Sequence, residues 1–447
     1  MIIDSLFAVS PIDGRYSDKT KKLQDFFSEY AIIKYRVIVE VKYFLELTKL
    51  NINPLMEITA NEKENIISIV EKFSENDAFR IKEIESITNH DVKAVEYFLK
   101  EKFDELGLFE YKEFIHFGLT SQDINNTAFH IALKDFLNED FFPQIEKTIN
   151  LINEKVVEYN DISILSHTHG QPASPSRLGK ELNVFSYRLE KEMHYLKNIE
   201  ITGKFGGAVG NFNAHYIAFP NIDWRNFADN FLFNELNIVR EQYTTQISNY
   251  DSLANIFDSV KRINTILLDF CKDIWAYISM DFFKQKINKN EIGSSAMPHK
   301  VNPIDFENAE GNLGIANALF EHLSAKLPIS RLQRDLTDST VIRNIGVPFA
   351  HCIIAHKSIE KGINKLIVNK EKINADLENN WIIIAEAVQT ILRRENYPNP
   401  YETLKNLTRT NAIVTKDTFV SFINSLDVSE DVKKELLQIT PQNYVGK

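Results

Sequence analysis

The sequence has little of what marks disulfide-bonded or membrane proteins. Its two cysteines, Cys271 and Cys352, lie in apolar stretches without the paired spacing of a zinc or redox site, so we expect buried reduced thiols. No apolar run approaches the roughly 20 residues that a membrane helix needs. The N-terminus lacks the basic segment of a secretory signal and reaches Asp4 almost at once. We therefore expect a cytoplasmic protein with no membrane partner.

Backbone-breaking residues and pooled positive charge are also scarce. Glycine (15) and proline (13) together reach about half their usual share, which favours long uninterrupted helices. The formal net charge is −11, and lysine and arginine are dispersed along the chain. The basic surface that nucleic-acid binding usually requires is therefore missing, and we expect no nucleic-acid partner.

What is present indicates a helical globular protein. The 447 residues, 44% hydrophobic and 25% charged, suit a soluble chain of two or three domains. Apolar residues recur at three- and four-residue steps from Leu253 to Ile278 and from Tyr30 to Leu50, which predicts long amphipathic helices. Alternation with period two is scarce, so few strands are expected. Several such helices in one chain favour an all-α fold with a bundle core.

Changes in pattern suggest three domains. A first helical region runs to about Leu108, and a turn containing Gly118, Thr120 and Ser121 precedes the next long helix. Another change falls near residues 369–375, after which shorter helices lead to the end. We predict an N-terminal domain at 1–115, a central long-helix bundle at 116–365 and a C-terminal helical domain at 366–447.

The segment 293–308, GSSAMPHKVNPIDFEN, combines a loop with a helix start. Its glycine and two serines, Ser294 and Ser295, cannot form a stable helix interior before a proline. Asn302 followed by Pro303 is typical of an N-cap and first helical position. Lys300 and Asn302 beside a positive helix terminus suit a bound carboxylate. The alternative is a capped helix with solvated neighbours.

The segment 166–175, SHTHGQPASP, contains one glycine and two prolines, so we expect a loop before the helix that follows. Its two histidines, His167 and His169, have one spacer between them. No acidic or cysteine partner stands at ligand spacing nearby, which disfavours a metal site.

Arginines and hydroxyls gather in the segment 330–344. Arg331, Arg334 and Arg343 with interspersed hydroxyls suit a phosphate, because guanidinium makes bidentate contacts. The alternative is a salt-bridged helix face that uses Asp335 and Asp338.

Two further segments are weaker on their own. Gly14, Arg15 and Tyr16 fit either a binding loop or a plain surface turn. His90 and Asp91 fit either a ligand contact or a helix cap.

These segments together resemble the adenylosuccinate lyase branch of the fumarase/aspartase superfamily. The spacing Gly-Ser-Ser-x-Met-Pro-x-Lys-x-Asn-Pro from Gly293 resembles the superfamily signature. Thr-His-Gly-Gln-Pro from Thr168 is similar to the adenylosuccinate and argininosuccinate lyase pattern. The run from Arg331 to Asn344 resembles the stretch that binds a nucleotide phosphate in the former. The resemblance extends from Pro11 to about Tyr444.

The resemblance implies a β-elimination that releases fumarate in purine nucleotide biosynthesis. Adenylosuccinate would give AMP, and the succinyl-carboxamide ribotide SAICAR would give AICAR. Ser294 would be the general base and His169, paired with Glu307, the general acid, a role that an unperturbed pKa near 6.5 suits. The other implied substrate contacts are Arg15, Tyr16, Asn89, His90, Asp91, Thr120, Ser121, Gln246, Lys300, Asn302, Asn308, Arg334, Ser339 and Arg343.

The resemblance also implies an all-α homotetramer whose active sites are shared between subunits, with no metal and no organic cofactor. Two alternatives stay open. A sister enzyme such as argininosuccinate lyase would use Ser294, His169 and Lys300 without the phosphate arginines. A non-enzymatic, crystallin-like relative would have lost activity, against which the intact Ser294 and His169 argue.

Overall fold

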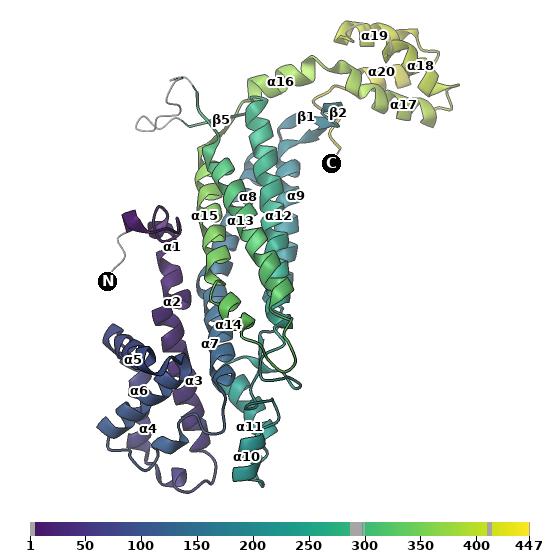
Figure 1. The fold of residues 1–447 in the computed structure, drawn as a ribbon. Coiled ribbons are helices and arrows are strands. Elements are labelled where there is room, and N and C mark those ends of the chain that lie inside the picture. The colour runs from purple at the N-terminus through teal and green to yellow at the C-terminus, as the bar shows by residue number, and fades with distance from the viewer. Residues whose placement is uncertain (1–4, 287–296, 298–299, 409–413, 447) are drawn as a thin grey trace. The chain divides into compact units, whose positions relative to one another are not determined.

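The computed structural model describes residues 5–286, 297, 300–408 and 414–446 (Figure 1). Helices make up most of this part of the chain, and its six short strands form three two-stranded sheets. No helix in the described ranges is long and apolar enough to cross a membrane. The predicted all-α class with few strands is confirmed.

The chain divides into two compact units. Unit 1 comprises Met1–Ile145, Glu192–Thr265 and Gly311–Lys357, and unit 2 comprises Glu146–Lys191, Ile266–Glu310 and Ser358–Lys447. These units are groups of residues in mutual contact, and each unit is made of three separate segments of the chain. The three consecutive domains remain a prediction.

Unit 1 carries most of the shorter helices. They are α1 (Ser17–Thr20), α2 (Gln24–Phe27), α3 (Glu29–Leu47), α4 (Ala60–Glu71), α5 (Glu75–Thr88), α6 (Asp91–Glu105), α7 (Ser121–Phe136), α10 (Asn213–Ala218), α11 (Trp224–Asn230) and α14 (Thr337–Ile342), with the parallel pair β3 (Thr202–Gly203) and β4 (Val239–Arg240).

An aromatic core holds α3 in unit 1. Tyr43 is fully buried on this helix, and its ring centroid lies 5.4 to 6.1 Å from those of Phe205, Phe227 and Phe231. Edge-to-face rings of this kind stabilise the core by more than the burial of their apolar area alone. Helix α3 also carries Arg36, which lines a small cavity of the candidate site described below. The aromatic core therefore fixes one wall of that site.

Five long helices supply residues to the two units. They are α8 (Phe142–Glu158), α9 (Leu178–Lys197), α12 (Asp251–Ser279), α13 (Ile304–Lys326) and α15 (Gly346–Lys365). Within unit 1, the rings of Phe257 and Phe320 pack against Phe349. Within unit 2, Phe306 takes the space at Gly362, where an added Cβ would lie 2.7 Å from the ring. The predicted helix from Leu253 to Ile278 is confirmed as α12.

Unit 2 carries two antiparallel strand pairs and the C-terminal helices. They are β1 (Ser163–Thr168) with β2 (Gln171–Arg177), β5 (Phe283–Gln285) with β6 (Leu366–Val368), α16 (Lys370–Glu378), α17 (Ala385–Arg394), α18 (Pro400–Thr408), α19 (Lys416–Ser425) and α20 (Glu430–Leu437). The predicted change to shorter helices after residues 369–375 is confirmed.

The prediction of a loop at residues 166–175 was wrong. The segment belongs to the β1–β2 hairpin, whose turn residues His169 and Gly170 have φ of 54° and 74°. Two successive positive φ angles give a turn that matches the twist of paired strands. Pro172 and Pro175 are tolerated in β2 because it has one partner strand, so the ladder does not need every N–H group.

Two helix boundaries also differ from expectation. The helix predicted from Tyr30 to Leu50 ends at Leu47. Helix α13 begins at Ile304 rather than at Pro303, whose carbonyl accepts from the N–H groups of Phe306 and Glu307 at 3.1 and 3.2 Å. Proline therefore caps this helix instead of opening it.

Candidate functional site

The junction of α5 and α6 presents a carboxylate at a helix N-terminus. Asn89 ends α5 in the left-handed conformation with φ of 51°. His90 is the N-cap of α6, and its Nδ1 accepts from the Lys93 N–H at 3.1 Å. Asp91 Oδ1 accepts from its neighbour Val92 N–H at 2.8 Å, which leaves Oδ2 for other partners. The capping interpretation of His90 is confirmed.

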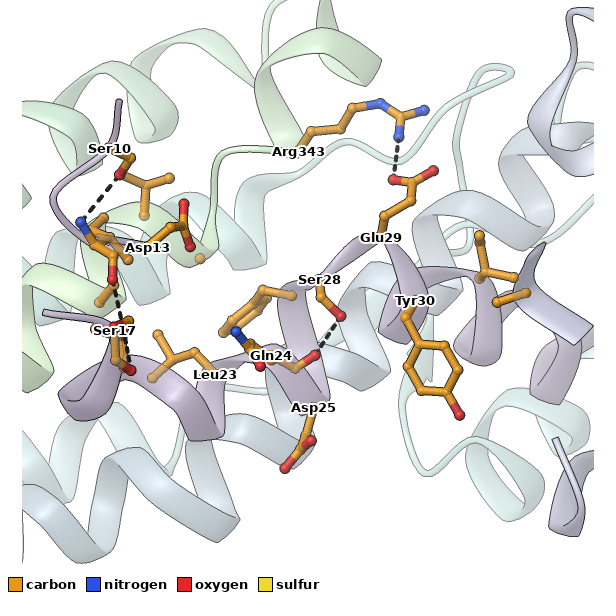
Figure 2. A pocket seen from close by; sticks show the side chains of 18 of the residues that line it. Ser10, Asp13, Ser17, Leu23, Gln24, Asp25, Ser28, Glu29, Tyr30 and Arg343 are labelled. Carbon is orange, nitrogen blue, oxygen red and sulfur yellow. Dashed lines mark hydrogen bonds and ion pairs between the residues drawn. The ribbon is translucent and has the colours of Figure 1, made fainter. Parts of the chain in front are cut away.

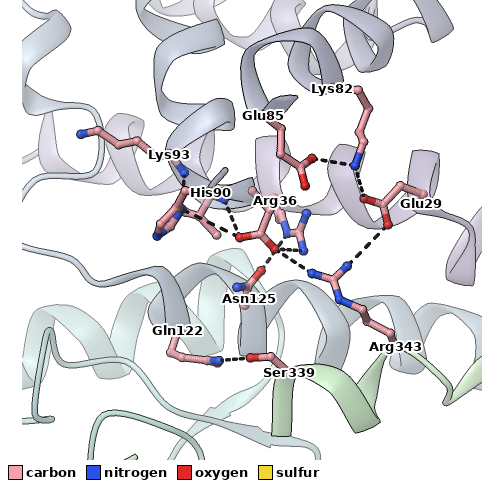
Figure 3. A network of polar contacts seen from close by, with 12 residues as sticks. Glu29, Arg36, Lys82, Glu85, His90, Lys93, Gln122, Asn125, Ser339 and Arg343 are labelled. Atoms are coloured by element: carbon pink, nitrogen blue, oxygen red, sulfur yellow. Dashed lines mark hydrogen bonds and ion pairs between the residues drawn. The ribbon is translucent and has the colours of Figure 1, made fainter. Parts of the chain in front are cut away.

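Two arginines meet on Asp91 (Figure 3). Arg36 Nη2 and Arg343 Nη2 each lie 2.9 Å from Asp91 Oδ2. Arg36 is almost completely buried on α3, and its Nε donates to Asn125 Oδ1 at 2.8 Å. Burial acts to raise the pKa of Asp91, but the two guanidinium groups and the Val92 N–H hold that pKa below its usual value. Asp91 is therefore ionised at neutral pH and oriented by its partners.

Arg343 also reaches a second carboxylate. Its Nη1 lies 3.5 Å from Glu29 Oε2, and the ammonium of Lys82 lies 3.2 Å from Glu29 Oε1. The Arg343 side chain stays 43% exposed, so it can reach a ligand from solvent.

A cavity of about 910 Å³ opens beside Glu29 and Arg343 (Figure 2). Residues on both sides of Arg15 and Tyr16 line it, among them Ser10, Asp13 and Ser17. The Arg15 side chain is exposed, and its guanidinium carbon lies 6.0 Å from the centroid of the Tyr16 ring. The N-terminal segment predicted to bind phosphate thus borders a cavity that Arg343 also borders.

Helix α14 carries the second part of the predicted phosphate group. Ser339 Oγ accepts from Gln122 Nε2 at 3.2 Å and from Arg334 Nη2 at 3.5 Å. Arg334 Nη1 donates to Gln246 Oε1 at 3.0 Å. Ser339 and Arg343 line one small cavity together with Arg36. Predicted site residues from three separate segments, at Asp91, at Gln246 and at 334–343, are therefore connected through hydrogen bonds and ion pairs.

The alternative prediction for segment 330–344 was a face whose arginines pair with Asp335 and Asp338. It fails for the two predicted site arginines, Arg334 and Arg343. Asp335 lies 3.6 Å from Arg331 and accepts from the Thr337 N–H at 2.8 Å. The buried Asp338 accepts from Tyr250 OH at 3.0 Å and Gln122 Nε2 at 3.2 Å. Among the described residues, Arg331 thus makes the expected pair with Asp335, whereas Arg343 pairs with Asp91 and Glu29.

The start of α7 is a second helix N-terminus whose geometry is fixed by hydrogen bonds. Thr120 is its N-cap, and the Thr120 N–H donates to Asp123 Oδ2 at 2.8 Å. Asp123 Oδ1 lies 2.7 Å from the Lys204 ammonium, and both side chains are fully buried. Burial lowers the pKa of Lys204 in spite of Asp123 beside it. This pair fixes the turn that presents Thr120 and Ser121, where a helix N-terminus suits a carboxylate.

In unit 2, the predicted acid His169 stands at the tip of the β1–β2 hairpin. Its side chain is exposed, and among the described residues it has no hydrogen-bond partner. Glu307, in the first turn of α13, accepts from Trp275 Nε1 at 3.1 Å. The pairing of His169 with Glu307 stays a prediction.

The rest of the signature segment is described in part. Ser294, Ser295 and their neighbours at 287–296 lie outside the described residues. Lys300 is exposed, Asn302 is partly buried, and Asn308 Oδ1 accepts from Ser358 Oγ at 2.9 Å. The described ranges contain no group of three or more His, Cys, Asp or Glu arranged to hold a metal ion. Cys271 and Cys352 are buried free thiols, as predicted.

Several connecting residues escaped the sequence analysis. Gln122 stands within the Gly118 to Asp123 segment and joins it to Ser339. Arg36 interrupts the apolar stripe of a helix that was predicted to be buried. A buried charge needs a partner, so its position in the sequence could have indicated a contact of this kind. Glu29, Lys204 and Tyr250 gave no such signal, because their partners come from distant parts of the sequence.

Comparisons with known proteins find similarity along almost the whole chain. A family model described as Lyase matches residues 14–316, and one described as Adenylosuccinate lyase C-terminal matches residues 330–445. The chain is 52% identical to the adenylosuccinate lyase of Dictyostelium discoideum over 99% of this chain and 97% of that protein. It is 49% identical to those of Vibrio cholerae and Escherichia coli K12 over 100% of this chain and 98% of each.

Solved structures with low sequence identity share the fold. The fumarate lyase of Mesorhizobium sp. BNC1 aligns with a TM-score of 0.73 at 17% identity over 95% of each chain. The 3-carboxy-cis,cis-muconate lactonizing enzyme of Pseudomonas putida gives the same score and identity over 95% of this chain and 94% of that one. At this identity the likeness extends to the fold alone.

Proposed function

Because the chain belongs to the adenylosuccinate lyase family, we propose that it releases fumarate from adenylosuccinate to give AMP, and from SAICAR to give AICAR. The connected group of Arg334, Ser339, Arg343, His90 and Asp91 carries the choice of substrate. A phosphate-bearing nucleotide needs donors such as the two arginines and Ser339, and a substrate without phosphate does not.

The chemistry is a β-elimination. Ser294 removes the proton from the succinyl carbon next to a carboxylate, and the carbon–nitrogen bond then breaks. Charge that develops on that carboxylate is stabilised by Lys300, Asn302 and the N-terminus of α13. His169 donates a proton to the leaving nitrogen, and Glu307 holds the imidazolium. The electron pair of the broken bond leaves with the nitrogen, so the products are fumarate and the amine.

The remaining residues bind the substrate. Thr120 and Ser121 hold a succinyl carboxylate at the start of α7, and Gln246 and Asn308 complete the contacts. Arg15 and Tyr16 join the phosphate group from the N-terminal segment, and Asn89 holds the backbone turn before His90. The fully buried Asp123–Lys204 pair supports this division, because it fixes the Thr120 turn before any ligand arrives.

Phosphate binding would draw on an arginine that already has carboxylate partners. Arg343 contacts Asp91 and Glu29 in the structure, so a phosphate must compete with or join these ion pairs. Two carboxylates near an anion site weaken non-specific anion binding, and a dianion with several hydroxyl contacts overcomes them. This arrangement favours a nucleotide over inorganic anions.

We also propose a cytoplasmic homotetramer in which several subunits contribute to each active site. Exposed apolar side chains on long helices, such as Tyr187, Trp275 and Ile315, support association. Sedimentation of the purified chain at several concentrations tests the subunit number.

The test of function is fumarate release from adenylosuccinate, SAICAR and argininosuccinate, measured separately with the purified protein. We expect turnover of the first two. Ser294→Ala should abolish turnover while the variant still binds adenylosuccinate. Fumarate from argininosuccinate alone would replace this proposal by the sister activity, and none from any substrate would favour the structural relative.

A further inference from the structure

The C-terminal end of the chain, residues 442–446, runs along the hairpin that carries His169, and we call it the C-terminal strap. Ser163 Oγ donates to the Gln442 carbonyl at 2.6 Å, and Arg177 Nη2 donates to the Gly446 carbonyl at 3.3 Å. Ser163 and Arg177 are paired across the two strands. The strap therefore clamps both strands at the base of the hairpin.

A second contact joins the strap to the middle of β2. Glu386, in the first turn of α17, accepts on its Oε2 from Ser174 Oγ and, at 3.0 Å, from Tyr444 OH. One carboxylate oxygen thus links the strand to the strap. Gln442 Nε2 also donates to Glu378 Oε1 at the end of α16, at 2.7 Å, which fixes the strap to the helices around it.

The hairpin needs such support. A two-stranded hairpin is marginally stable by itself in water and holds one geometry only when it packs against other elements. In the part of the chain that the structure describes, no third strand joins this sheet. The exposed imidazole of His169 has no described hydrogen bond of its own, so the hairpin backbone sets where the ring points.

We propose that the C-terminal strap positions the general acid, with Glu386 and Tyr444 as positioning residues that act through Ser174 and the hairpin backbone. The inference rests on the proposed role of His169. Catalytic groups must be held within a fraction of an ångström, and a misplacement of about 1 Å can cost up to a hundredfold in rate. A loosened hairpin should therefore slow proton donation and leave substrate binding almost unchanged, because the proposed phosphate contacts lie on other elements.

The experiment compares Glu386→Ala, Glu386→Gln and Tyr444→Phe in the full-length protein. We expect Glu386→Ala to lower kcat about tenfold and Tyr444→Phe about threefold, with KM within about twofold. Glu386→Gln should keep most activity, because an amide oxygen still accepts both hydrogen bonds. Tyr401→Phe and Glu402→Ala are matched controls on α18, and their kcat should equal that of the unmodified chain.

Hydrogen exchange followed by mass spectrometry gives a readout that needs no activity. Peptides covering 163–177 should exchange faster in Glu386→Ala than in the unmodified chain and at the unmodified rate in Glu386→Gln. Unchanged exchange in Glu386→Ala, faster exchange with unchanged kcat, or a rise in KM alone would each overturn the proposal. If the unmodified chain releases no fumarate, the proposed function fails, and the exchange result still decides whether the strap holds the hairpin.

Discussion

The α5–α6 junction and the tip of the β1–β2 hairpin both present a candidate site residue, but in opposite states. At the junction, Asp91 lies between two guanidinium groups, one of them on the buried Arg36. At the hairpin tip, His169 is exposed and has no hydrogen-bond partner among the described residues. The first residue is held before any ligand binds, whereas the second is placed only by its backbone.

This difference matches the proposed roles. A group that recognises a nucleotide gains affinity if its geometry is set in advance, because less order is lost on binding. A general acid acts by transferring a proton during turnover, so a change there lowers the rate of the chemical step more than the affinity for substrate. We therefore expect changes at the hairpin tip to act on kcat and changes around the junction to act on stability or KM.

The largest effect is expected at the hairpin tip. His169→Gln removes the proton donor and should lower kcat by about 10²–10⁴-fold, with KM changed only a few-fold. Steady-state kinetics of fumarate release measure this. His167→Gln is the matched control, one spacer away on β1, and should retain nearly full activity. Equal losses in the two variants would contradict the assignment of His169.

Removal of Arg36 should act on folding. Arg36→Met removes the buried partner of the Asp91 carboxylate, which keeps Arg343, so the free energy of unfolding should fall by about 1.5–3 kcal/mol, the value of a hydrogen bond to a charged group. Urea unfolding measures this change, at constant protein concentration because the proposed assembly would add stability. Arg80→Met is the control: its ion pairs with Glu83 and Glu101 are exposed, so their loss should leave the free energy of unfolding almost unchanged. A small change in Arg36→Met would show that the network is not pre-set.

Arg334→Ala should weaken nucleotide binding. The loss of charge-assisted hydrogen bonds to a phosphate, about 1.5–3 kcal/mol, corresponds to a rise in KM of about 10- to 100-fold with kcat little changed. Arg331→Ala is the control on the same segment, since the Arg331 side chain is 81% exposed and pairs with Asp335. An unchanged KM in Arg334→Ala would remove this arginine from the phosphate group.

The smallest effect concerns pH and the turn before Thr120. His116 Nδ1 lies 2.6 Å from Glu40 Oε1. Burial acts to lower the pKa of His116, but the Glu40 carboxylate outweighs it and raises that pKa above its ordinary value. The stabilisation from this pair is therefore complete below about pH 6.5, the ordinary histidine pKa, and is lost as pH rises through the raised folded value.

His116→Gln should thus destabilise the protein by about 1–2 kcal/mol at pH 6 and by less at pH 9. Thermal unfolding of both proteins at the two pH values measures the difference. If the difference in stability between the unmodified protein and His116→Gln grew with pH, the charged pair of His116 and Glu40 would be contradicted.

Most of the fold class and much of the site could be predicted from local sequence. The period of apolar residues predicted α3 and α12, and the acidic first turn of α13 followed from residues 302–307. The hairpin was missed because its prolines and glycine are typical of loops. The strand pairing that runs from Ser163 with Arg177 to Thr168 with Gln171, together with the two positive φ angles at the turn, distinguishes the hairpin from a loop.

By itself, the sequence determined which side chains are available: two serines before a proline, a histidine before glycine, and arginines spaced among hydroxyls. Local chemistry sets these features, because caps, turns and helix periods depend on neighbours in the chain. Tertiary structure decided the partners. Asp91 meets Arg36 and Arg343, and Ser174 meets Glu386, because folding brings together residues far apart in the sequence, and no local pattern encodes such contacts.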